Sequence, residues 1–162
     1  MAGINSTLLN QYFTYKNGLL IRNITTSSKA IVGSEIKGLD KEGYVRVSIH
    51  NKNYRVHRLI YMMFYGYMPK RIDHVNGVVN DNRIENLREC TANQNQHNSK
   101  KPINNSSGFK NVYFCKNTNN WYVQLRINKK KVSFYGIESI ELADLVAQEA
   151  RDKYHKEFAR HK

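Results

Sequence analysis

The chain of 162 residues is long enough for one ordinary domain or two small ones. Lys and Arg number 26 against 13 Asp and Glu, so the formal net charge is +13 and the sequence pI is about 9.8. This excess predicts a polyanionic partner, nucleic acid or an anionic membrane surface. It argues against a basic protein whose charge serves solubility alone, because like charges also repel one another.

Cysteines and apolar runs indicate the compartment. Cys90 and Cys115 are too few for a disulfide framework, and neither belongs to a CxxC pair that would hold structural zinc. We expect both to be free thiols in a reducing compartment. Residues 1–13 lack the basic and apolar regions of a signal peptide, and the longest apolar-rich run, 59–68, is about half of what a bilayer crossing needs. The sequence therefore predicts a cytoplasmic protein.

Short strands are expected over residues 1–56. The stretch 12–21 carries a hairpin signal at Asn17-Gly18, and residues 43–56 alternate on both sides of an expected turn at 51–53. A helix is then predicted from His57 to Tyr65, ended by Gly66 and Pro69. The residues expected to enter its core are Leu59, Ile60, Met63 and Phe64. We expect His57 to be a hydrogen-bonded structural residue.

Residues 71–98 are unusually polar and predict a hairpin followed by a helix. "RIDHV" and "RIENLREC" give two short strands, and Thr91 can cap a helix through "ANQNQHNSK". Asp73 and His74 are adjacent, so on a regular strand their side chains point to opposite faces. They can converge only where the strand bends or ends, and the Asn76-Gly77 turn supplies such an end.

The side chains of this segment suit phosphodiester hydrolysis, which needs a metal to neutralise developing charge and a base to take a proton from water. Asp73 and Asn95 offer the hard oxygen ligands that Mg²⁺ or Mn²⁺ prefers. Neutral His74 can be the base, because its ordinary pKa lies near neutrality. Asn86 cannot perform acid–base chemistry, but its amide can bond across the long turn and fix the hairpin.

A second module follows a stretch rich in Ser, Asn and Lys, "NSKKPINNSSG", which we assign as a linker. Three strand-like pieces come next, at 111–115, 121–127 and 132–135, and then a helix pattern from about Ile140 to Phe158. Ser139 can cap this helix. Its apolar stripe is formed by Ala143, Ala147, Ala150, Tyr154 and Phe158.

Charge is segregated within this module. Residues 101–137 contain seven Lys or Arg and no acidic residue, whereas 138–160 carry six acidic and four basic residues. This predicts a sheet face that meets phosphate. Alternation along "WYVQLRI" puts Trp121 and its apolar neighbours on the packed face. It leaves Tyr122, Gln124 and Arg126 on the other face, where they could read base edges.

The strings "DHVNG", "NDNRIENL" and "TANQN", in this order, resemble the ββα-metal motif of HNH endonucleases. The likeness is to the phage and intron-associated branch, in which the last His of the name is replaced by Asn. It implies that Asp73 and Asn95 bind the metal, that His74 activates water and that Asn86 is the central structural Asn. We assign His74 and Asn86 to the catalytic centre, and add Arg83 as a phosphate contact. The preceding "VHRLIYMMFYG" resembles the helix that leads into this motif.

The strings "KNVYFCKNTNNWYVQLRINKKK" and "ELADLVAQEARDKYHKEFA" resemble the AP2 DNA-binding domain, a three-stranded sheet packed on one helix. Asn111 stands where that family usually has Gly, and Asn tolerates positive φ better than most residues. The resemblance implies that outward sheet residues enter the major groove. The predicted DNA contacts of this module are Lys110, Tyr113, Lys116, Tyr122, Gln124, Arg126 and Lys130.

We therefore expect an α+β protein: an HNH module with an N-terminal β-rich extension at 1–98, a linker at 99–107 and an AP2-like domain at 108–162. The predicted function is a divalent-metal-dependent DNA endonuclease of phage homing type, which nicks one strand as a monomer in the host cytoplasm. Its partners are Mg²⁺ or Mn²⁺, with no structural zinc, and double-stranded DNA, with no membrane and no evident obligate protein partner.

Three alternatives remain open at this point. The main one is a non-catalytic DNA-binding regulator that retains an HNH scaffold, although binding alone would not need Asp73, His74 and Asn95 together. The second is an RNA-binding protein, for which no aromatic stacking platform is evident in the sequence. Membrane-surface binding ranks last, because the charge is spread over two strand-rich modules and no basic amphipathic helix is seen.

Overall fold

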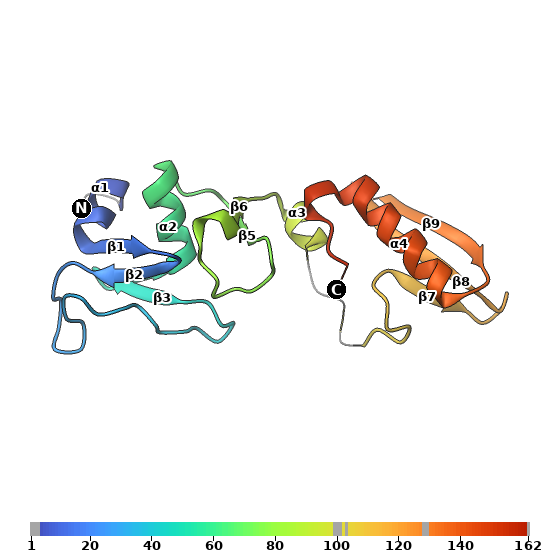
Figure 1. Cartoon of the computed structure of the whole chain (residues 1–162), viewed down its shortest axis with the longest axis horizontal. Helices are drawn as coiled ribbons and strands as arrows, with labels where there is room; N and C mark the ends of the chain where they lie inside the picture. Colours follow the sequence, from blue (N-terminus) through green and yellow to red (C-terminus); the bar gives the residue numbers. More distant parts are fainter. Residues whose placement is uncertain (1–3, 99–101, 103, 128–129, 162) are drawn as a thin grey trace. The chain divides into compact units, whose positions relative to one another are not determined.

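The computed structural model describes residues 4–98, 102, 104–127 and 130–161 (Figure 1). The chain divides into two compact units, Met1–Cys90 and Thr91–Lys162. We refer to them as unit 1 and unit 2. Residues 99–101 and 103 of the predicted linker lie outside the described residues. The domain limits 1–98, 99–107 and 108–162 stay a prediction. None of the described helices has the length and apolar character needed to cross a membrane.

Unit 1 begins with a helix that the sequence analysis did not predict, α1 (Ser6–Tyr12). Asn5 caps it, since its Oδ1 accepts a hydrogen bond from the amide of Leu8 at 2.8 Å. The expected hairpin follows as β1 (Phe13–Lys16) and β2 (Leu19–Arg22). Its turn residues, Asn17 and Gly18, have φ values of 46° and 88°, as a two-residue hairpin turn requires.

The second hairpin pairs β3 (Arg46–Ile49) with β4 (Lys52–Arg55). Its turn lies at His50 and Asn51, one residue earlier than the expected turn at 51–53. Both residues have positive φ, 47° and 62°, which a tight two-residue turn demands at both central positions. The expectation from the Asn-Lys-Asn string was therefore wrong in register.

Helix α2 (Val56–Tyr65) ends at Gly66, which has a φ of 78° and donates its amide to the carbonyl of Met62. Leu59 and Ile60 are fully buried, as expected. Phe64 was expected in the core but is 50% exposed. The helix also buries Val56, His57 and Tyr61, so its buried residues lie in its first two turns, before Phe64.

Unit 1 closes with a second short hairpin, β5 (Ile72–His74) and β6 (Leu87–Glu89), joined by a long loop with a 3₁₀ turn, η1 (Ile84–Asn86). The strands are antiparallel, with Asp73 opposite Arg88 and His74 opposite Leu87. Leu87 joins the core built by α1, the two N-terminal hairpins and α2. This core supports the loop between β5 and β6.

Unit 2 begins with α3 (Ala92–His97), which starts with a capping box: Thr91 Oγ1 accepts from the Gln94 amide, and Gln94 Oε1 accepts from the Thr91 amide. A three-stranded antiparallel sheet follows, β7 (Val112–Cys115), β8 (Asn120–Ile127) and β9 (Lys130–Ile137). Helix α4 (Ile140–His155) lies across one face of this sheet (Figure 1). The expected sheet-plus-helix arrangement is confirmed.

The buried stripe of α4 differs from the expected one at its C-terminal end. Ala143, Ala147 and Ala150 pack on Val123 and Leu125 of the sheet, and Ser139 caps the helix by accepting from the Leu142 amide at 3.1 Å. Tyr154, however, is 37% exposed, and Arg151 and His155 take the buried positions. Helix α4 ends at His155 and a 3₁₀ turn, η2 (Lys156–Phe158), then brings Phe158 into the core.

Candidate active site

Asp73 and His74 are the last two residues of β5, and both are buried, at 6% and 5% exposure. The chain turns directly after them, with the Gly77 amide donating to the His74 carbonyl at 2.8 Å. A strand end at this point is what the sequence analysis required for the two side chains to serve one site. Burial of an acid and an imidazole side by side is unusual unless each has a partner.

The partner of Asp73 is Arg88, which faces it across the hairpin. Arg88 donates from Nε and Nη2 to Asp73 Oδ2, at 3.0 and 2.8 Å. The two side chains are 7% and 19% exposed, so water screens this ion pair only weakly. Arg88 therefore orients the carboxylate. The sequence analysis assigned Arg88 no role.

A partner of His74 is Asn82, which comes from the loop and is 2% exposed. His74 Nε2 lies 3.1 Å from Asn82 Oδ1, inside hydrogen-bond distance. Burial lowers the pKa of His74 below its ordinary value, although the contact with Asn82 opposes that shift. The ring is consequently neutral at pH 7, which is the form that accepts a proton.

Asn86 holds the two sides of the loop together. Its Oδ1 accepts from the Asn76 amide at 3.0 Å, and its Nδ2 donates to Asn76 Oδ1 at 3.0 Å and to the Asp81 carbonyl at 2.7 Å. The backbone carbonyl of Asn86 also accepts from the Val75 amide. These bonds start one residue after His74, so Asn86 fixes the path of the chain as it leaves β5.

Arg83 is 45% exposed on the same loop, but carboxylates already neutralise its charge. Its Nε and Nη2 donate to the two carboxylate oxygens of Asp81 at 2.9 and 2.8 Å, and Glu85 lies 3.9 Å away. The hydrogen bond from Arg83 lowers the pKa of Asp81 to about 2. A phosphate contact by Arg83 would compete with this pair.

Asn95 lies in the second half of α3, in unit 2, and its side chain is exposed. Within the described residues, no group of three or more His, Cys, Asp or Glu side chains could hold a metal ion. The donors singled out by the sequence are instead one carboxylate and one amide oxygen. Each is a hard oxygen donor of the kind that suits Mg²⁺ or Mn²⁺, which keep waters and bind substrate phosphate in addition to a carboxylate or two.

The predicted DNA contacts of unit 2 lie mostly on the sheet face opposite α4. Tyr113, Tyr122 and Tyr135 stack across the three strands, with ring centroids 5.3 and 5.5 Å apart. Gln124 donates to Ser133 Oγ at 3.2 Å. Three further members of the predicted set are exposed, namely Lys116, Arg126 and Lys130.

Lys110 differs from the other predicted contacts because it is only 8% exposed. Burial, and then the nearby charge of Arg151, lower the pKa of Lys110 to about 8. The fully buried Arg151 donates from Nη1 to the Lys110 carbonyl at 2.6 Å and lies 3.4 Å from Asn111 Oδ1. Asn111 has a φ of 70°, the conformation expected for an Asn in the place of Gly. Lys110 thus belongs to the interior contacts of this turn.

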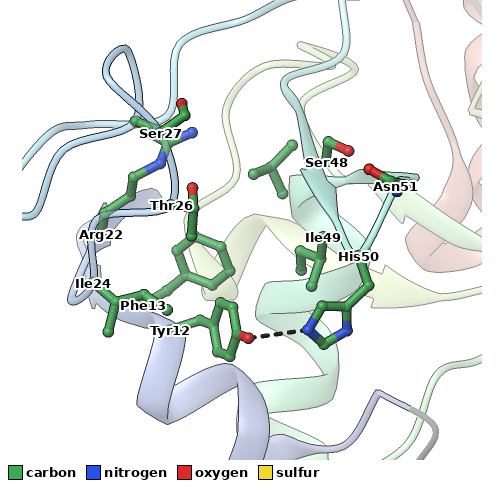
Figure 2. Close-up of a pocket in the computed structure, with 12 residues that line it drawn as sticks. Tyr12, Phe13, Arg22, Ile24, Thr26, Ser27, Ser48, Ile49, His50 and Asn51 are labelled. Carbon is green, nitrogen blue, oxygen red and sulfur yellow. Dashed lines mark hydrogen bonds between the residues drawn. The ribbon is translucent and has the colours of Figure 1, made fainter. Parts of the chain in front are cut away.

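Unit 1 also contains a cleft of about 460 Å³ between the first two hairpins, with Phe13 on one side and Ile49 on the other (Figure 2). Figure 2 shows the hydroxyl of Tyr12 directed at His50, where Tyr12 Oη and His50 Nε2 are 3.0 Å apart. Asp73, His74 and Asn86 are not among its lining residues. The cleft is therefore separate from the candidate active site.

Sequence reasoning missed four residues that contact this site: Asn82 and Arg88 from the loop and β6, and Tyr44 and His57 from earlier in the chain. Tyr44 and His57 have ring contacts with His74, at centroid distances of 5.9 and 5.0 Å. The expectation that His57 is hydrogen-bonded is wrong for Nδ1, which is buried and has no hydrogen-bond partner among the described residues. The only signal for Asn82 was its place in the quoted string "NDNRIENL".

Comparison with known proteins gives one result. Residues 54–97 match the family model described as HNH endonuclease. The matched segment starts in β4, contains α2 and the whole β5–β6 hairpin, and ends with α3. No curated protein and no solved structure matches the chain.

Proposed function

We propose that this chain is a divalent-metal-dependent endonuclease of phage homing type. The HNH endonuclease domain over residues 54–97 indicates a phosphodiester hydrolase that acts on DNA. The chain nicks one strand of duplex DNA as a monomer, since one catalytic base serves one phosphate. HNH nucleases generally use a divalent metal, and the proposal takes Mg²⁺ or Mn²⁺ as the ion. The similarity of "DHVNG" and "NDNRIENL" to the phage and intron-associated branch supports the homing type.

The proposed roles follow the chemistry of each side chain. His74 removes a proton from the attacking water, and Asn82 holds its ring. Asp73 and Asn95 supply oxygen ligands for the metal, and Arg88 orients Asp73. Asn86 maintains the loop that follows the base. When bound, the metal would stabilise the charge that develops on the phosphate and the leaving oxygen.

One observation carries this proposal: a buried, neutral His74 lies beside an ion-paired Asp73 within the segment that matches the nuclease family. Burying an imidazole and a carboxylate at a hairpin end contributes little to a core and costs desolvation. A DNA-binding protein without catalysis would not need this pair. The arrangement therefore favours the enzyme over the non-catalytic regulator.

Unit 2 is proposed to position the enzyme on duplex DNA through the sheet face that carries Tyr113, Tyr122, Gln124 and Arg126. Arg126, Lys116 and Lys130 are exposed cations of the kind that contacts phosphate or base edges. Tyr113 and Tyr135 stack on Tyr122 and remain 41% and 71% exposed, so this face also presents aromatic surface to the DNA. Lys110 is left out of the proposed contacts because it is buried.

The test is conversion of supercoiled plasmid carrying DNA of the native phage or host by the purified chain, with Mg²⁺ or with EDTA. We expect open-circular DNA only with the metal, and none from His74→Ala, while binding of the same DNA is retained. His50→Ala is the matched control, because His50 is an exposed histidine of unit 1 that lies in the β3–β4 turn, outside the loop between β5 and β6. Tight binding without cleavage by the wild-type chain would support the regulator. Linear product formed at first order by a monomer would contradict nicking.

A further inference from the structure

Tyr44 is held at one position by a short turn that begins at Asp40. Asp40 Oδ1 accepts from the amides of Glu42 and Tyr44, at 2.9 and 3.0 Å, and the Asp40 amide donates to the Tyr44 carbonyl at 2.9 Å. The turn is joined to α2, because the Val56 amide donates to the Val45 carbonyl at 2.8 Å. Tyr44 therefore has a fixed backbone next to the first turn of that helix.

The ring of Tyr44 is fixed as well. The guanidinium of Arg55 lies over it at 3.9 Å from the ring centroid, a cation–π arrangement. Arg55 is itself held by two carboxylates, donating from Nε to Asp40 Oδ2 at 2.9 Å and from Nη2 to Glu42 Oε2 at 2.7 Å. The phenol ring is thus packed against a guanidinium that two carboxylates hold in place.

The same Tyr44 ring contacts two histidines. Its centroid is 5.3 Å from that of His57 and 5.9 Å from that of His74, and the two histidine rings meet edge-to-face at 5.0 Å with an interplanar angle of 73°. The three rings come from different segments: the turn before β3, the first turn of α2 and the end of β5. They form a contiguous aromatic cluster around the candidate base.

His57 takes part in this cluster through packing. It is 5% exposed, and its buried Nδ1 has no hydrogen-bond partner in the part of the chain that the structure describes. An unsatisfied buried polar atom costs about 1–3 kcal/mol, so a purely structural position would be better filled by an apolar ring. Burial, and then the nearby His74, lower the pKa of His57 to about 3. His57 is therefore neutral at pH 7 and does not repel a proton on His74.

We propose that Tyr44 and His57 are positioning residues, which fix the plane of the His74 ring while Asn82 fixes one edge of it. This inference rests on the proposed function, in which His74 is the base. The rings packed against the imidazole restrain its plane, in addition to the restraint that the contact with Asn82 gives. Misplacing a catalytic group by about 1 Å can cost about 100-fold in rate.

The experiment compares single-turnover nicking rates and DNA affinities of the whole chain with Mg²⁺. Tyr44→Ala and His57→Ala are expected to lower the rate by about 10- to 100-fold and to leave DNA affinity within about twofold. Tyr44→Phe and His57→Phe keep a ring in each place, so each should restore most of the rate. The matched control is Tyr61→Ala, which removes a buried ring of α2 whose ring contacts are with Tyr65 and Tyr67.

A second measurement does not depend on cleavage. In the metal-free protein, NMR cross-peaks between the ring protons of His74 and those of Tyr44 and His57 are expected, and Tyr44→Ala should shift the His74 ring signals. Absent cross-peaks overturn the inference, as do equal nicking rates for all variants of an active enzyme. A Tyr61→Ala rate that falls as far as Tyr44→Ala also overturns it, because the loss would then follow stability. A wild-type chain that cuts no DNA overturns the proposed function and this inference together.

Discussion

Asp73 and Arg88 face each other across β5 and β6, and two nitrogen donors of Arg88 converge on one carboxylate oxygen, Oδ2. The pair therefore fixes the carboxylate of a proposed metal ligand through a neighbouring strand of the same hairpin. A ligand on a short, solvent-facing loop would have no such restraint. The pairing of β5 with β6 thus determines the orientation of the Asp73 carboxylate.

Removing Arg88 should destabilise unit 1, because the buried carboxylate of Asp73 would lose its ion pair with Arg88. We expect Arg88→Ala to lower the free energy of unfolding of unit 1 by about 3 kcal/mol. Hydrogen exchange of peptides from residues 72–89 measures this locally. In a double-mutant cycle with Asp73→Ala, we expect a coupling energy between the two residues of at least about 1 kcal/mol. Strictly additive losses would contradict the pairing.

Asn86→Ala should open the loop after His74. The change leaves the Asn76 amide and the Asp81 carbonyl without their side-chain partner, at a cost of about 2–4 kcal/mol for the lost bonds. We expect faster amide exchange at Val75 and Asn76 and a lower cleavage rate. Asn53→Ala, at an exposed position of β4, is the control that should leave both unchanged.

Acid should destabilise unit 1 through His57. The folded pKa of His57 is about 3, below its ordinary value of 6.5, so the unfolded chain binds more protons between these two pH values. The contribution of His57 is complete above pH 6.5 and is lost as pH falls toward 3, with a loss of about 3 kcal/mol by pH 4.5.

The readout must be specific to unit 1, because the single tryptophan, Trp121, reports on unit 2. Hydrogen exchange of peptides from α2 at pH 7 and pH 4.5 provides it. His57→Phe cannot take up the proton, so its exchange should change less between the two pH values. An equal change in both proteins would show that other groups carry the acid sensitivity.

Arg126→Ala should weaken DNA binding by unit 2. If Arg126 contacts phosphate, affinity falls uniformly across sequences and the slope of log K against log salt decreases by about one. If it contacts a base edge, sequence preference relaxes at one position and about 1–3 kcal/mol of discrimination is lost. Lys153→Ala, which removes an exposed cation from α4, is the control. Equal losses from both variants would point to a general charge effect.

Local signals predicted much of the secondary structure. Asn17-Gly18, Gly66, Thr91 and Ser139 marked a turn and helix ends correctly, because each acts on its own neighbours in the chain. Helix α1 was missed, since only Asn5 and two leucines mark it. The expected core positions of Phe64 and Tyr154 were wrong because periodicity does not tell which side of a helix meets the rest of the fold.

The sequence by itself determined the order of chemical groups: Asp-His at a strand end, Asn86 in the following loop and Asn95 on a capped helix, with basic residues on a separate sheet. Only the tertiary structure decided what surrounds the base. Tyr44 is 30 residues from His74 in the chain, and its contact depends on the Asp40 turn, Arg55 and α2 packing together. Such contacts arise from the packing of separate segments, which no local pattern encodes. For the same reason Lys110, basic in a basic stretch, is buried beside Arg151.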